Sequence, residues 1–290
     1  MQLLWIKAII TTTLIFLGTQ GMAYEFKCIH ERNTAPQLDH IADDWFTQAR
    51  RLSKERLPDW VQVAQLYQKA VDKGHWKAMH NLAELYLRGK GVAKNTNKAI
   101  DLYQRMIELD VPLGYYDMSV MVQRGVGVVQ SDKDAMLFLL KAADLGNPNA
   151  QTRIGYIYIH EKRQYAAGVG YLKCAAMQDF ADANYKLATY YELLDRNYPV
   201  AMHYYQRTAA LGERKGALEI ENVFKLGKLE YPKNESVAKA YGGVSSQLFE
   251  DPEIRFPHLE RDHPLPPHPI QGYHADKDIN WKPTGRADDY

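Results

Sequence analysis

The stretch GYYDMSVMVQRGVGVVQSDKDAMLFLLKAADLGNPNA, residues 114–150, contains the unit that the rest of the chain repeats. It predicts two short antiparallel helices. Gly125 and Gly127 end the first, because glycine is unfavourable inside helices and readily adopts positive φ. Ser131 is a good N-cap for the second. The apolar residues of this second helix recur at the spacing of one helix face and are Ala135, Phe138, Leu139, Ala142 and Ala143.

The same pattern recurs along the chain at a nearly fixed spacing. Two sets of equivalent positions, one before and one at the start of each first helix, are separated by steps of 36, 36, 33 and 33 residues. They are Gly74, Asp110, Gly146, Asp179 and Gly212, and Ala78, Gly114, Ala150, Ala183 and Gly216. A single helix pair cannot bury its own apolar face, so the pairs must stack. The sequence therefore predicts an all-α fold, a right-handed α-solenoid of stacked antiparallel helix pairs.

Residues 1–23 have the features of a cleavable signal peptide. Lys7 precedes an apolar run, Ala8 to Leu17, that is too short to span a bilayer core of about 30 Å. Small residues at Gly21 and Ala23 suit cleavage before Tyr24. A retained membrane anchor is the alternative, which the short run disfavours. We expect a periplasmic protein, secreted through a cleavable signal peptide and without a membrane span in the mature chain.

The mature chain divides by composition into three parts. Residues 24–37 predict an irregular lead-in, and 38–250 predict the solenoid, which we expect to be one extended domain. Its first helix pair is expected at 39–54 and 60–72, and a degenerate last pair at 216–224 and 235–249. The segment 251–290 is rich in Pro and His and is either a tail or an extended arm on the solenoid. Its apolar residues favour the arm: Ile254, Phe256, Leu265, Ile270 and Trp281.

Composition and motifs argue against several classes of function. The net charge of +1 gives no strong field for nucleic acid or a membrane surface. Nucleophile elbows, phosphate-binding loops and zinc-protease motifs are missing from the sequence, so we expect no enzyme and no cofactor. Metal binding is conceivable at four tail histidines, but their spacing matches no closed site and we interpret them as solvated: His258, His263, His268 and His274.

The chain has two cysteines, Cys28 and Cys174. Cys174 is conceivable as a catalytic thiol, but its repeat contains no histidine beside it to activate it. In an oxidising compartment, pairing is the more natural use of two cysteines. We expect a disulfide that connects the lead-in to the third complete repeat.

The repeated residues also resemble a known family. The pattern in Ala78 to Val92, Lys98 to Tyr103 and Ala142 to Ala150 resembles the Sel-like repeat, a relative of the tetratricopeptide repeat, over about residues 60–217. A narrower resemblance, to periplasmic Sel-like repeat proteins of Gram-negative bacteria, is carried by the segments at 26–31, 114–118, 174–176 and 264–267. Some of these proteins resemble immunity proteins encoded beside type VI secretion effectors of the phospholipase kind. The implied role is to bind the incoming lipase toxin and block it.

The first helices supply the candidate partner-binding face. Their solvent-facing register carries tyrosines and charges of both signs, and first helices line the concave side in this type of superhelix. The candidate residues are His80, Asn81, Glu84, Tyr116, Asp117, Val120, Arg124, Thr152, Arg153, Tyr156, Tyr185 and Lys186. The arm could instead fold back and fill this face. The alternative function is a periplasmic scaffold that binds a resident envelope protein. The sequence does not indicate whether the protein is a monomer or an oligomer.

Overall fold

The computed structural model describes residues 26–269, and the predicted signal peptide lies outside them. Within this range the regular elements are all helices, packed consecutively as antiparallel pairs, which confirms the predicted all-α solenoid. No helix in the described part is both long and apolar enough to cross a membrane. We expected one extended domain, and the described residues form two compact units: residues 31–150 are unit 1, and residues 26–30 with 151–269 are unit 2.

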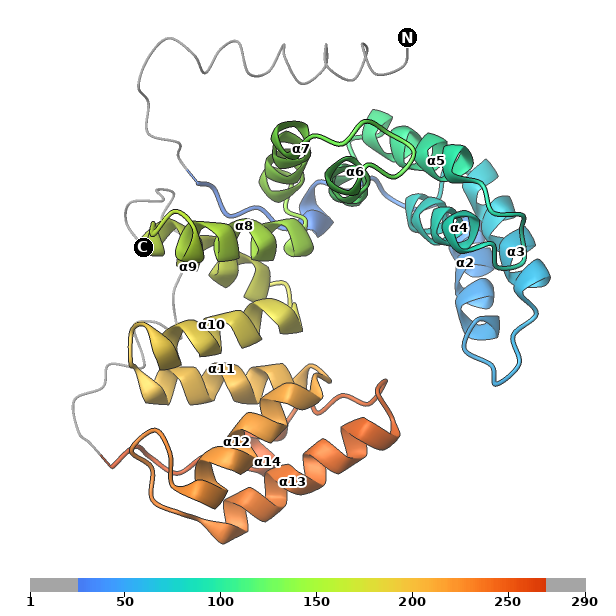
Figure 1. Cartoon of the computed structure of the whole chain (residues 1–290). Helices are drawn as coiled ribbons and strands as arrows, with labels where there is room; N and C mark the ends of the chain where they lie inside the picture. The colour runs from blue at the N-terminus through green and yellow to red at the C-terminus, as the bar shows by residue number, and fades with distance from the viewer. Residues whose placement is uncertain (1–25, 270–290) are drawn as a thin grey trace, which may run out of the picture. The chain divides into compact units, whose positions relative to one another are not determined.

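Unit 1 contains a short 3-10 helix and three helix pairs, each helix packed on the next (Figure 1). The elements are η2 (Glu31–Asn33), α2 (His40–Leu52), α3 (Trp60–Asp72), α4 (Trp76–Arg88), α5 (Thr96–Glu108), α6 (Pro112–Arg124) and α7 (Asp132–Asp144). The predicted cap is confirmed, since Ser131 Oγ accepts a 3.1 Å hydrogen bond from the Asp134 amide. Gly125 ends α6 at a φ of 66°, a left-handed conformation that suits glycine.

Unit 2 continues the pattern with shorter repeats. Its helices are α8 (Pro148–His160), whose first turn belongs to unit 1, then α9 (Tyr165–Ala176), α10 (Ala181–Leu193), α11 (Tyr198–Ala210), α12 (Arg214–Leu226), α13 (Glu235–Glu250) and α14 (Leu259–Asp262). Arg163 and Arg196 occupy the left-handed region in the turns inside the two shorter repeats. Large apolar side chains fill the core, including Tyr171, Leu172, Leu187, Tyr205, Ile220 and Phe224.

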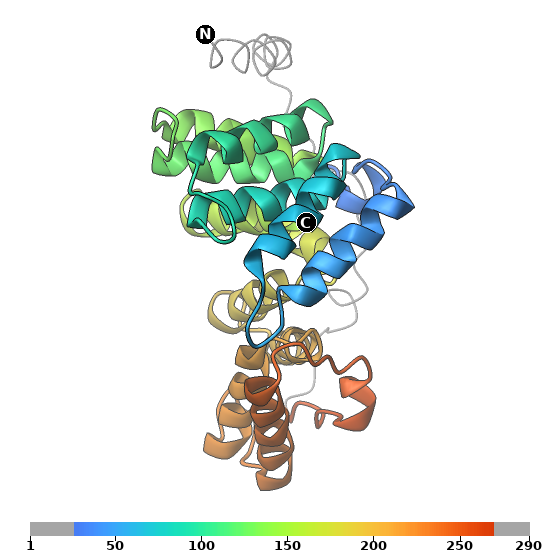
Figure 2. The same ribbon diagram turned by 90° about the vertical axis from the view of Figure 1, so that its right-hand side faces the viewer.

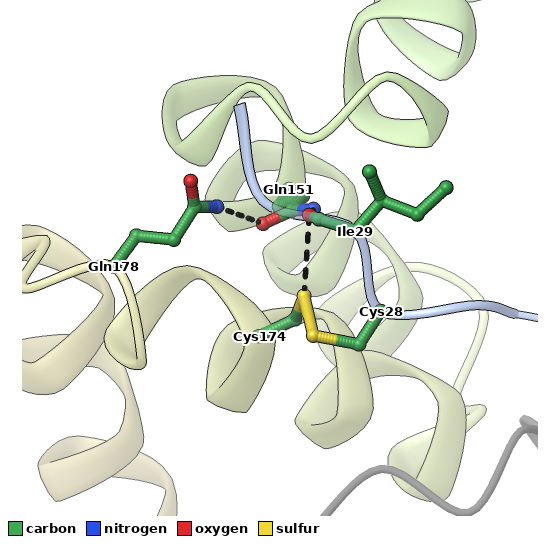
Figure 3. Close-up of a disulfide and its surroundings, with 5 residues drawn as sticks. All are labelled: Cys28, Ile29, Gln151, Cys174 and Gln178. Carbon is green, nitrogen blue, oxygen red and sulfur yellow. Dashed lines mark hydrogen bonds between the residues drawn. A yellow bond between two sulfur atoms is a disulfide. The ribbon is translucent and has the colours of Figure 1, made fainter. Parts of the chain in front are cut away.

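A disulfide joins Cys28 to Cys174 on α9, as predicted (Figure 3). Phe26 is 1% exposed, and its ring centroid lies 4.0 Å from that of Tyr171. Beside the bond, Gln151 Nε2 donates to the Ile29 carbonyl at 2.8 Å. The lead-in residues 26–30 are therefore part of the packed core of unit 2. Cys174 is fully buried and bonded, which excludes the catalytic-thiol alternative in this structure.

The segment 251–269 lies beside α11 and α13 (Figure 2). The Phe256 amide donates to the Ala210 carbonyl at 3.0 Å, and the Tyr241 hydroxyl donates to the His263 carbonyl at 2.7 Å. Three of the expected docking residues, Ile254, Phe256 and Leu265, pack against the core, and the other two, Ile270 and Trp281, lie outside the described residues. The described part of this segment is thus an arm packed on unit 2.

The expectation of solvated tail histidines is wrong for His268. Its side chain is only 3% exposed, because the ring packs edge-on against Tyr231 at 4.6 Å. His268 Nε2 also lies 3.2 Å from the Leu229 carbonyl oxygen. His274 lies outside the described residues.

Candidate functional site

In unit 1, the candidate residues on α4 and α6 are held by contacts within the chain. His80 Nδ1 lies 2.6 Å from Asp117 Oδ2, and the Asp117 side chain is only 8% exposed. Asn81 Nδ2 donates to the Tyr67 hydroxyl at 2.9 Å. Glu84 accepts hydrogen bonds from Arg88 at 2.8 Å and from the Tyr103 hydroxyl at 3.3 Å. These polar groups are therefore satisfied inside unit 1, and the His80–Asp117 pair joins two successive first helices.

Burial and charge shift the pKa values of this cluster. Burial raises the pKa of Asp117, and the hydrogen bond from His80 offsets this only in part. Burial alone would lower the pKa of His80, but the hydrogen bond to Asp117 and the nearby carboxylates raise it above its usual value. Burial also raises the pKa of Glu31, whose carboxylate accepts a 2.8 Å hydrogen bond from Asn147 Nδ2. The cluster is a polar contact inside unit 1, built around one histidine–aspartate pair.

Two of the candidate residues do not face solvent as the sequence led us to expect. Asp117 is 7% exposed because it pairs with His80, one repeat earlier, and Thr152 is 2% exposed. Arg124 is exposed, while Tyr116 and Val120 are half-buried. Simple helical periodicity places Asp117 at the surface, but it ignores the neighbouring repeat, whose first helix covers part of the outward side.

In unit 2, the corresponding face carries a row of aromatic rings and cations across α8, α10 and α12, in which Tyr156 is exposed and the other members are half-buried. Tyr156 on α8 is 44% exposed, and Lys186 Nζ on α10 lies 4.7 Å from the centre of its ring. One repeat later the arrangement recurs, with Lys215 Nζ of α12 lying 4.3 Å from the ring centre of Tyr185. Each such contact contributes about 0.5–1 kcal/mol at an exposed site. The row is therefore ordered by weak contacts and remains open to a partner.

Carboxylates connect these pairs. Asp182 lies between the two lysines, with Oδ1 3.0 Å from Lys215 Nζ and Oδ2 3.8 Å from Lys186 Nζ. The Tyr185 hydroxyl donates to Glu219 Oε1 at 3.4 Å, and burial, followed by the Glu219 charge, raises the tyrosine pKa. We call this set, together with the half-buried Arg153 of α8, the outer row; its other members are Tyr156, Asp182, Tyr185, Lys186, Lys215 and Glu219.

Three members of the outer row were missed by the sequence prediction: Asp182, Lys215 and Glu219. The repeat itself holds the signal that could have found them. Lys215 follows Asp182 by one 33-residue step, and Glu219 follows Lys186 by the same step. In the stack Lys215 comes within ion-pair distance of Asp182, so following Asp182 into the next repeat would have identified this pair, whereas Glu219 accepts from the Tyr185 hydroxyl.

One group of possible metal ligands occurs in the described part of the chain. The side chains of Cys28, His30 and Cys174 bring their ligand atoms within 4.8 Å of one another. Both sulfur atoms belong to the disulfide, so neither is available as a thiolate ligand in this structure.

Comparison with known proteins gives three consistent results. The family model described as Sel1 repeat matches residues 64–75, 76–111, 112–147, 148–180 and 181–213. The structure of immunity protein PA5088 from Pseudomonas aeruginosa is 45% identical with a TM-score of 0.78, covering 88% of this chain and 100% of that chain. Immunity protein Pa5087 from the same organism is 43% identical with a TM-score of 0.73, at the same coverage.

The curated relatives are more distant. Chitin synthase regulatory factor 2 of Schizosaccharomyces pombe is 28% identical over 175 residues, which are 54% of this chain. The chain spans only about a third (34%) of the length of that relative.

Proposed function

The chain belongs to the Sel1 repeat family and is similar to the solved immunity proteins PA5088 and Pa5087 along their whole length, and we propose that it is an immunity protein. Its role is to bind a type VI secretion toxin of the lipase or phospholipase class in the periplasm and to neutralise it. No catalytic step is required, because binding alone can cover the surface through which a lipase reaches its substrate.

The observation that carries this proposal is the extent of the similarity to PA5088. Sel1 repeats alone would support only a protein-binding scaffold. The match covers 88% of this chain and 100% of that chain at 45% identity, so it extends well beyond the family-model matches, which end at residue 213. The toxin class comes from the sequence resemblance described above.

The periplasmic location has two supports. The first is the predicted signal peptide at residues 1–23. The second is the Cys28–Cys174 bond, because structural disulfides form and persist in oxidising compartments.

The outer row of unit 2 is the surface we propose for toxin binding. Tyrosine is enriched at binding hot spots, and an exposed ring gains most when a partner removes it from water. The row also presents both signs of charge, which favours a partner with complementary charges and disfavours others. The exposed Arg124 and the half-buried Tyr116 and Val120 of unit 1 remain candidates for additional contacts.

Co-expression tests the proposal. The mature chain, produced in the periplasm, should rescue growth of cells that export the lipase-type toxin encoded beside its gene, and the two purified proteins should form a complex that lacks lipase activity. A chain that neither binds this toxin nor protects the cells, but binds a resident envelope protein, would contradict the immunity role and favour the scaffold.

A further inference from the structure

A groove lies between α12 and α13, the last helix pair of unit 2, with a volume of about 720 Å³. Leu218 and Phe224 of α12 line one side, and Gly242, Ser245 and Ser246 of α13 line the other. None of these residues belongs to the outer row. The groove is therefore a separate surface of unit 2.

The register of the repeats shows which position of the helix stack the groove occupies. Asn197 caps α11 by accepting from the Val200 amide, and Asn234 caps α13 by accepting from the Val237 amide. The caps are 37 residues apart, so Gly242, Ser245 and Ser246 of α13 correspond to Tyr205, Thr208 and Ala209 of α11.

Those three α11 residues hold the next first helix. Gly216 of α12 approaches them so closely that a Cβ there would lie 2.7 Å from the Ala209 amide nitrogen and 2.8 Å from Thr208 Cβ, and would overlap the Tyr205 carbonyl oxygen. In unit 1, Gly114 of α6 approaches the corresponding α5 residues, and its Cβ would lie 3.1 Å from the Ile107 nitrogen. This face of a second helix therefore receives a first helix in both units.

On α13 the same face receives no helix within residues 26–269. The arm packs elsewhere, with its α14 against α11, so the position of one further first helix remains open as the groove. The α13 residues at this position are small, and Gly242 replaces the bulky Tyr205, which leaves room for a helix backbone to approach.

The charges of the groove indicate what kind of helix it accepts. Four cations and two carboxylates line it: Arg214, Lys225, Lys233 and Lys239, with Glu221 and Glu235. Glu221 Oε1 lies 3.7 Å from Lys225 Nζ, so these two charges form an ion pair within the groove. Arg214 donates to Ser245 Oγ at 3.1 Å and lies 5.1 Å from the ring centre of Phe249, which is 71% exposed. Lys233 and Lys239 have no carboxylate within ion-pair distance in the described part of the chain.

We propose that the α12–α13 groove binds an acidic helix of the toxin, in the position that the next first helix of the repeat would occupy. The inference rests on the proposed immunity function and adds a second contact surface to it. Small residues on α13 admit the helix backbone, the unpaired lysines attract its acidic side chains, and Phe249 with Arg214 contacts its end. Aromatic and arginine side chains of this kind are frequent anchors of interfaces.

Two matched glycine substitutions test the groove. Gly242→Tyr restores the residue found at the equivalent position of α11 and fills the groove; its Cβ would meet only the movable end of Glu221, at 3.3 Å. Gly243→Tyr places the same side chain one residue away, where a Cβ has nothing within 4 Å. Both replace a glycine inside a helix, so helix propensity favours folding of both variants. By calorimetry with the purified toxin, Gly242→Tyr should weaken the Kd about tenfold or more, and Gly243→Tyr should leave it within about twofold.

A charge reversal tests the partner's chemistry. Lys233→Glu combined with Lys239→Glu should weaken the Kd about tenfold, with an effect that shrinks as salt is raised. Lys69→Glu combined with Lys133→Glu makes the same charge change on exposed residues of unit 1 and should have little effect.

If the groove is occupied by something other than a helix of the toxin, the same variants give different results. If the wild-type chain binds the toxin and Gly242→Tyr does not change the affinity, the groove proposal is overturned and the immunity function stands. A wild-type chain that does not bind the toxin overturns both. If deletion of residues 270–290 strengthens toxin binding and abolishes the effect of Gly242→Tyr, the groove holds the chain's own C-terminal segment. If Gly242→Tyr instead separates a dimer at constant toxin affinity, the occupant is a second copy. Either of these last two results overturns the proposal.

Discussion

The first helices of the two units use their outward faces in different ways. In unit 1, His80 of α4 and Asp117 of α6 form a close pair whose aspartate is buried. In unit 2, Tyr156 of α8 and Lys186 of α10 form a contact whose ring is 44% exposed. The same repeat thus produces an internal polar contact in one unit and an open, weakly ordered surface in the other. Exposure in a solenoid depends on the residue one repeat away, not only on the helical face.

The difference extends to how the lead-in is attached. Unit 1 holds its part by hydrogen bonds, including one from Trp76 Nε1 to the Pro36 carbonyl at 3.1 Å. Unit 2 holds its part by the disulfide and by the buried ring of Phe26. We therefore expect substitutions in unit 1 to act on stability and substitutions in the outer row to act on binding.

The largest effect is expected from removing the disulfide. The cysteines are 146 residues apart, so the closed loop is long and the entropic stabilisation reaches about 5 kcal/mol as an upper figure. Cys28→Ala combined with Cys174→Ala should lower the free energy of unfolding by several kcal/mol in denaturant titration. Reductant should destabilise the wild type and leave the double variant unchanged, and equal stability of the two proteins would contradict a stabilising role for the bond.

Breaking the pair in unit 1 should have the next largest effect. Asp117→Ala removes a buried carboxylate and leaves His80 without its partner, which should cost about 2–3 kcal/mol of unfolding free energy. The Kd for the toxin should not change, provided that the variant is assayed while folded. If Asp117→Ala kept the stability of the wild type but lost toxin binding, unit 1 and not the outer row would be the binding surface.

The outer row should show the opposite behaviour. Tyr156→Ala or Lys186→Glu should weaken toxin binding by about 1–3 kcal/mol if the row is a hot spot, while the free energy of unfolding stays within about 0.5 kcal/mol. Tyr165→Ala is a matched control, because Tyr165 is 37% exposed but lies on the second helix α9. If Tyr165→Ala weakened toxin binding as much as Tyr156→Ala does, the outer row would not be the specific binding surface.

The smallest expected effect is a difference in pH dependence. The raised pKa of His80 gives unit 1 stability that is present below about pH 6.5 and is lost as pH rises through the folded-state pKa. In unit 2, burial lowers the pKa of His203, so that its contribution to stability increases with pH instead. In denaturant titrations between about pH 5 and pH 8, His80→Gln and His203→Gln should change the slope of stability in opposite directions. Changes of the same sign would contradict these assignments.

Most of the fold could be predicted from the sequence because it depends on local periodicity. The Ser131 cap, the Gly125 turn and the helix at 235–249 follow from residue spacing alone. The disulfide followed from cysteine number and compartment.

The surface could not be predicted equally well. Asp117 and Thr152 were expected at the surface and are buried. For Asp117 the reason is its contact with His80, which lies 37 residues away in the sequence. The burial of His268 against Tyr231 has the same cause. Cross-repeat contacts such as Asp182 with Lys215 are encoded in the 33-residue step, but they are visible only once equivalent positions are paired.

Hydrogen–deuterium exchange of the chain with and without the purified toxin distinguishes the outer row from the internal polar contact of unit 1. We predict that the toxin slows exchange in α8, α10 and α12, which carry the outer row, and leaves α4 unchanged around His80. Protection confined to α4 and α6, with α8, α10 and α12 unaffected, would contradict it.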